Sequence, residues 1–156
     1  MEWEILKKKI YYFDGAWLDI YVLNASQEDW EKWAEYVNDK YEISFYNYQT
    51  DSYESKIAIP VITDYWNFRN DSSDMAADAI IKLGTIDIKC HFFDDTQIEN
   101  DFDPGDVQCI ADHEKLIDYM LNISKLLGKT VIMAPENTPS YTHISVEKGE
   151  VKMNLL

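Results

Sequence analysis

Tight-turn signals between short alternating segments are the feature that most restricts what this chain of 156 residues can fold into. Three of its five glycines, Gly15, Gly84 and Gly149, each stand between two segments of strand-like pattern. Glycine readily adopts the positive φ angles of a hairpin turn, and strands joined by such turns pair in antiparallel fashion. The predicted hairpins join residues 5–13 to 16–23, 79–83 to 85–93, and 143–147 to 150–155.

Two other segments have apolar residues at helical spacing. The first follows Ser26, a favoured N-cap, and runs to about Asp39. Its predicted core stripe is Trp30, Trp33, Ala34 and Val37. The second covers roughly 109–127 and ends at Gly128, a typical C-cap residue. The sequence therefore predicts one α+β domain over residues 1–156, a mostly antiparallel sheet built from hairpins with two amphipathic helices packed on one face.

The segments between these elements have weaker patterns. Residues 41–48 and 130–134 are predicted to be strands. The apolar run 57–62 is interpreted as an edge or irregular strand, because Pro60 cannot donate a ladder hydrogen bond. Residues 63–78 are predicted to be loop with at most a short helical turn, and the acidic segment between Phe93 and residue 109 is also read as a loop.

The charge is far from balanced: 29 Asp and Glu oppose 14 Lys and Arg, so the formal net charge is −15. Nucleic-acid and anionic-membrane binding both depend on cationic side chains, so the composition disfavours both. A negative field attracts cations instead, whether metal ions or basic proteins. An acidic surface that only keeps the protein soluble is the simpler alternative.

Several features favour a cytoplasmic protein. The N-terminal residues lack the basic-then-apolar order of a signal peptide, and no apolar run approaches the roughly 18 residues that span a bilayer. The two cysteines, Cys90 and Cys109, are too few for a disulfide framework and suit a reducing compartment.

Motifs of known chemistry are missing from the sequence. It contains no phosphate-binding glycine loop, no dinucleotide fingerprint and no Gly-x-Ser-x-Gly nucleophile elbow. We therefore predict no catalytic residue and no cofactor, and we expect a binding protein rather than an enzyme.

The stretch from His91 to Glu114 contains eight carboxylates and no Lys or Arg. Clustered carboxylates beside aromatic side chains suit a docking surface for a cationic partner. The predicted partner-binding residues are Asp94, Asp95, Glu99, Asp101, Phe102, Asp103 and Asp106. A calcium or magnesium loop fits less well because Gly105 stands where a third ligand is needed, and a merely solvated loop is the other alternative.

Two further sets of residues suggest metal chemistry. Cys90-His91 and Cys109-x-x-x-His113 offer four zinc-type ligands, although their periodicity also places Cys90 and His113 in the core. His91 with Asp94, Asp95 and Glu99 would suit a metal-dependent hydrolase, which is the alternative to a binding protein.

Several segments together resemble a known class of protein. They are Asp14-Gly15-x-x-Leu18-Asp-Ile-Tyr-Val22, Asp29-Trp30, Cys90-His-Phe-Phe93, Ile98-Glu-x-Asp-Phe-Asp-Pro104 and Pro135-Glu-Asn137. In these segments the chain is similar to small acidic bacterial immunity proteins of polymorphic toxin systems of the contact-dependent inhibition type. The resemblance implies a cytoplasmic protein that binds and neutralises one toxin domain, often a basic nuclease. An acidic accessory domain with a different partner is the remaining alternative.

Overall fold

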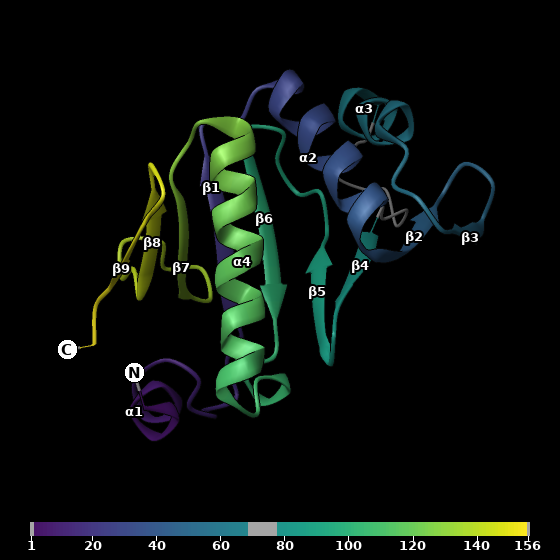
Figure 1. Ribbon diagram of the computed structural model, residues 1–156. Coiled ribbons are helices and arrows are strands. Elements are labelled where there is room, and N and C mark those ends of the chain that lie inside the picture. Colours follow the sequence, from purple (N-terminus) through teal and green to yellow (C-terminus); the bar gives the residue numbers. More distant parts are fainter. Residues whose placement is uncertain (1, 69–77, 156) are drawn as a thin grey trace.

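The computed structural model describes residues 2–68 and 78–155 and has an antiparallel sheet of nine strands at its centre. Their order across the sheet is β3-β2-β4-β5-β6-β1-β7-β8-β9, so β6 lies in the middle, between β5 and β1 (Figure 1). The strands are β1 (Leu18–Leu23), β2 (Glu42–Asn47), β3 (Ser52–Glu54), β4 (Asp78–Leu83), β5 (Ile86–Cys90), β6 (Gln97–Phe102), β7 (Val131–Pro135), β8 (Ile144–Glu147) and β9 (Glu150–Met153). The predicted α+β class and the hairpins β4–β5 and β8–β9 are confirmed.

Two helices, α2 (Gln27–Lys40) and α4 (Ile110–Leu127), pack against each other and cover one face of this sheet (Figure 1). A capping box between Ser26 and Asp29 starts α2. Gly128 ends α4 in the left-handed conformation at φ 64°. Both helices were predicted from the sequence. Among the described residues, none of the helices has the length and the hydropathy of a membrane span.

A chain of buried polar contacts links both helices to β6. The indole Nε1 of Trp33 on α2 donates to the Tyr119 hydroxyl on α4 at 3.1 Å. That hydroxyl donates to Asn100 Oδ1 on β6 at 2.6 Å. Because strand side chains alternate between faces, Asn100 on the helix side places Glu99 and Asp101 on the opposite side.

The first predicted hairpin is wrong. Residues 5–13 do not form a strand; the chain forms helix α1 (Trp3–Lys9) and a turn instead. Leu6 and Ile10, one helical turn apart, are both buried. The Tyr11 hydroxyl and His113 Nδ1 are hydrogen bonded at 2.7 Å, which attaches this segment to α4.

Three further predictions are corrected. The run 57–62 is not an edge strand, because helix α3 (Ile59–Phe68) begins inside it, and Pro60 is tolerated in a first turn that needs no amide donor. The acidic loop before α4 contains β6 and a short 3-10 helix, η1 (Pro104–Asp106). The predicted loop 63–78 is wrong over 63–68, which belong to α3, and its residues 69–77 lie outside the described residues.

Candidate functional site

Carboxylates follow β6 from the loop before it to the loop after it. Asp94 and Asp95 precede the strand, Glu99 and Asp101 lie on it, and Asp103 follows it. We call this set the carboxylate stripe; its members are Asp94, Asp95, Glu99, Asp101, Asp103 and Asp106. A strand of six residues is about 17 Å long, so the stripe is extended and does not form a single ligand cluster.

The aromatic contribution to this surface differs from the prediction. Phe102 is 0% exposed and contributes to the core on the helix side of β6, so it cannot act as the expected exposed anchor. Phe93, in the loop before β6, is 58% exposed and its ring stacks on that of His91. Phe93, which directly precedes the stripe at Asp94, is therefore a large apolar side chain exposed to solvent beside it.

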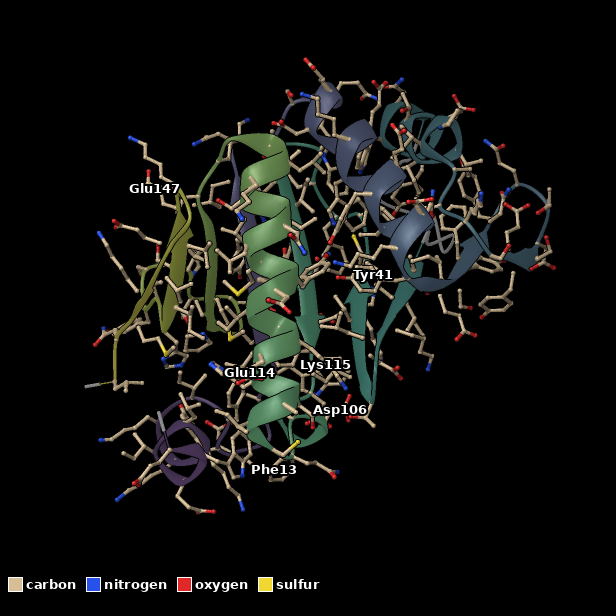
Figure 2. The ribbon with its side chains drawn as sticks, in the orientation of Figure 1. Phe13, Tyr41, Asp106, Glu114, Lys115 and Glu147 are labelled. Atoms are coloured by element: carbon tan, nitrogen blue, oxygen red, sulfur yellow. The ribbon has the colours of Figure 1, made fainter. Side chains whose placement is uncertain are left out.

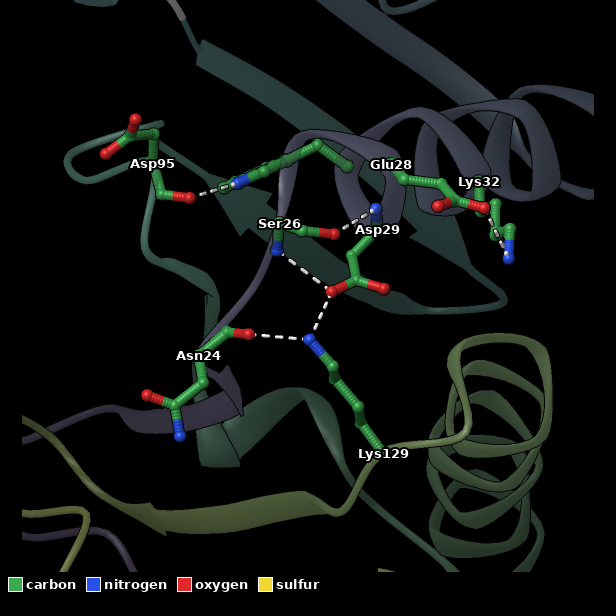
Figure 3. Close-up of polar contacts among 8 residues, drawn as sticks. Asn24, Ser26, Glu28, Asp29, Lys32, Asp95 and Lys129 are labelled. Atoms are coloured by element: carbon green, nitrogen blue, oxygen red, sulfur yellow. Dashed lines mark hydrogen bonds and ion pairs between the residues drawn. The ribbon is translucent and has the colours of Figure 1, made fainter.

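Two tryptophan side chains, one on α2 and one on α3, donate hydrogen bonds to the backbone of the loop between β5 and β6. Trp30 Nε1 on α2 donates to the carbonyl oxygen of Asp95 at 2.9 Å (Figure 3). Trp66 Nε1 on α3 donates to the carbonyl oxygen of Phe92 at 2.8 Å. These two bonds fix the backbone of the acidic loop at Phe92 and Asp95.

The other end of the stripe lies where α4 begins. Figure 2 shows Asp106 there, at the opposite end of the sheet from Glu147. Asp103 Oδ1 accepts a hydrogen bond from the Gly105 amide at 2.8 Å, and Asp106 Oδ2 accepts one from the Asp87 amide at 3.4 Å. These two carboxylates therefore bind the backbone of their own turn and of β5.

The middle of the stripe gains a carboxylate that the sequence analysis missed. Asp19 on β1 is the direct neighbour of Asp101 on β6, and Tyr21 is the neighbour of Glu99. Asp19 is only 1% exposed. Its Oδ2 accepts hydrogen bonds from the Tyr21 hydroxyl at 2.6 Å and from the Asn137 amide at 2.9 Å. We call Asp19, Glu99 and Asp101 the central carboxylates.

The central carboxylates repel one another in a partly desolvated place. Burial raises the pKa of Asp19, and the charge of Asp101 raises it further, against the hydrogen bonds of Tyr21 and Asn137. Burial followed by the charges of Asp19 and Asp101 raises the pKa of Glu99. The central carboxylates therefore favour the binding of a proton or a cation between them, because either would reduce their mutual repulsion.

Two buried carboxylates outside this group, Asp29 and Asp112, each have a lysine nearby. Asp29 contacts Lys129 and the Ser26 amide (Figure 3), and these hydrogen bonds outweigh burial, so the pKa of Asp29 is lowered. Asp112 lies 3.8 Å from Lys115. Over the described ranges, neither a lysine nor an arginine forms an ion pair with any central carboxylate.

Two basic groups close to the central carboxylates are Lys89 on β5 and His91 directly after it. His91 Nε2 is 3.6 Å from Asp101 Oδ2, and this interaction raises the pKa of His91. Lys89 is the neighbour of Asp101 in the sheet, but its ammonium lies 4.5 Å from the centre of the Trp17 ring. The negative charge of the centre is thus only partly compensated within the chain.

The predicted metal ligands are not brought together. Within the described part of the chain, no group of three or more His, Cys, Asp or Glu side chains is arranged to hold a metal ion. Cys90 is buried, which raises the pKa of its thiol, whereas Cys109 is exposed at the start of α4. Neither the zinc alternative nor the hydrolase alternative gains support from this geometry.

Comparisons of the chain with family models, with curated proteins and with solved structures find no match. The resemblance to immunity proteins therefore remains a prediction. The carboxylate stripe with its buried centre is the feature of the molecule on which a functional proposal rests.

Proposed function

We propose that this protein binds a basic protein partner, and that it acts as an immunity protein that neutralises a toxin domain by covering its cationic site. The observation that carries the proposal is the only partly compensated charge of Asp19, Glu99 and Asp101, which lie together on two neighbouring strands. Like charges placed together in a partly buried position cost folding free energy, and proteins retain such costs chiefly at functional sites. A cation supplied from outside would compensate this charge.

The surroundings of the centre suit protein docking. The exposed Asp94 and Asp95 before β6, with the partly exposed Asp103 and Asp106 after it, would steer a basic partner during encounter. The expected result is fast, salt-sensitive association. Phe93 adds apolar area, which ion pairs exposed to solvent do not supply. Because Trp30 and Trp66 hold the acidic loop, little conformational entropy is lost on binding.

The test compares how two neutralised variants bind the toxin domain that a pull-down with the wild-type protein recovers from the native cell. The double substitution Glu99→Gln with Asp101→Asn removes two charges from the stripe. The matched control, Glu31→Gln with Glu35→Gln, removes two charges from the exposed side of α2. We expect the stripe variant to lose about 2 kcal/mol or more of binding free energy in calorimetry, and the control less than about 0.5 kcal/mol.

Equal weakening in both variants would mean that only net charge matters and that the stripe is not the interface. Growth of cells that express the toxin gives the functional readout, since an immunity protein protects them. Protection that survives loss of the stripe charges would contradict the proposed interface.

A further inference from the structure

Two buried carboxylate oxygens on neighbouring strands have no hydrogen-bond partner among the described residues. They are Asp19 Oδ1 on β1 and Asp101 Oδ1 on β6. Their residues are directly opposite each other, and side chains in that relation have Cβ atoms about 5 Å apart. Leaving a buried acceptor without a hydrogen bond is costly, so these two oxygens require a proton or a donor from outside the fold.

Within residues 2–68 and 78–155, no side chain or backbone amide donates to either oxygen. The two donors at Asp19, the Tyr21 hydroxyl and the Asn137 amide, are bonded to Oδ2. His91 approaches Oδ2 of Asp101, and the Lys89 ammonium lies over Trp17. A single proton on Asp19 Oδ1 would turn that oxygen into a donor toward Asp101, and it would satisfy both oxygens at once.

We propose that Asp19 and Asp101 share one proton in the free protein, and that with Glu99 they form the receptor for a single ammonium or guanidinium group, whose entry displaces that proton. The second half rests on the proposed function, because it identifies the group that a basic partner would insert. Glu99 and Asp101 are partly exposed and contact the incoming cation. Asp19 is buried and does not touch the cation, but it loses the shared proton when the cation binds Asp101. The displaced proton passes to solvent, and the cation compensates the charge that deprotonation leaves.

The groups that face this centre come from five parts of the chain. Their charges act on the pair in both directions, with carboxylates favouring the proton and cations opposing it. They are Asp19 and Tyr21 on β1, Glu99 and Asp101 on β6, Lys89 on β5 with His91 directly after it, Glu136 after β7, and Asp78 on β4, whose charge acts on His91. Carboxylates outnumber cations in this set, so the environment favours retention of the proton when no partner is bound.

The first experiment uses the free protein and needs no partner. Carbon NMR of protein with labelled aspartate carboxyls follows Asp19 through a pH titration. We expect Asp19 to titrate in two coupled steps, the later one above its ordinary pKa of 3.8, and we expect Asp101→Asn to abolish the coupling. Asp103→Asn is the matched control and should leave the titration of Asp19 unchanged. A single step at or below the ordinary pKa would overturn the shared proton.

The second experiment adds a cation at fixed pH, using the amide of acetyl-arginine as the probe. We expect the Asp19 carboxyl signal to move toward its deprotonated position as the probe binds, and sodium chloride at equal ionic strength to leave it in place. Glu99→Gln should weaken probe binding severalfold, whereas Glu31→Gln on α2 should not. If backbone shifts spread evenly over the acidic surface while the Asp19 signal stays unchanged, the receptor is wrong.

The two proposals can fail separately. A normal Asp19 titration together with stripe-dependent toxin binding would refute the shared proton and leave the immunity role intact. A shared proton displaced by the arginine probe, without any toxin binding, would refute the immunity role and leave the cation receptor standing.

Discussion

Among single residues, Asp19 combines near-complete burial with two neighbouring carboxylates. Its folded pKa is raised above the unfolded value of about 3.8, so its stabilising contribution is complete below that pH and is lost as pH rises through the folded pKa. Asp19→Asn keeps an acceptor for Tyr21 and Asn137 and gains an amide donor toward Asp101. We expect it to stabilise the protein by about 1 kcal/mol at pH 7 and to make no difference near pH 3.

Urea unfolding at both pH values measures this effect. Asp103→Asn is the control, because Asp103 lies near the surface and its change should stay within about 0.5 kcal/mol. A loss of stability at pH 7 in Asp19→Asn would mean that the charged form of Asp19 is satisfied within the fold.

The Tyr11–His113 hydrogen bond is the second test at the residue scale. Tyr11→Phe leaves the buried His113 Nδ1 without its partner, which should cost about 1–2 kcal/mol of unfolding free energy. Tyr12→Phe, at a neighbouring and more exposed tyrosine, is the control and should cost little. Burial lowers the pKa of His113, so protonation favours the unfolded chain and stability should fall as pH drops below about 6.5.

The carboxylates of the stripe could be found from sequence because they lie close together along the chain and without basic residues between them. Asp19 could not be assigned to this site from the sequence, because more than half of the chain separates it from Asp101. Only the register of β1 against β6 brings the two together, and register between distant strands cannot be read from one sequence. Burial of Phe102 was missed for a related reason, because the segment around it was read as loop.

At the scale of elements, the tryptophan anchors predict how the acidic loop behaves. Trp66→Phe removes the indole donor to the Phe92 carbonyl while keeping most of the ring area. We expect faster amide hydrogen exchange over residues 91–96 and unchanged exchange in α4, because the loop loses one of its two anchoring bonds. Trp3→Phe serves as the control, because Trp3 lies in α1, stacks on Tyr11 and makes no contact with this loop in the described hydrogen bonds.

The elements that were predicted correctly have strong local patterns. Both α2 and α4 have a long apolar stripe and a recognisable cap, and the confirmed hairpins have glycine turns. The missed elements lack such patterns. In β6 the helix-facing positions are Ile98, Asn100 and Phe102, and the central asparagine, bonded to Tyr119, interrupts the apolar alternation. The aromatic residues 11–13, directly after α1, are typical of a strand and led to the wrong prediction. Leu6 and Ile10 nevertheless have helical spacing.

At the scale of the whole molecule, the net charge of −15 sets the response to salt. Self-repulsion destabilises a compact acidic protein, and added salt screens it. We expect the melting temperature to rise by a few degrees when sodium chloride is raised from about 10 mM to 150 mM, equivalent to roughly 1 kcal/mol. Sucrose controls for general exclusion effects, and a melting temperature that falls with salt would show that internal ion pairs dominate.

The central position of β1 also governs how the chain assembles during synthesis. Its neighbours β6 and β7 comprise residues 97–102 and 131–135, so the ribosome completes β1 long before either neighbour exists. Contacts between such distant segments form slowly, because a long loop must close first. A nascent chain arrested before residue 131 should therefore be digested readily by protease, and resistance should appear only once β7 has left the exit tunnel.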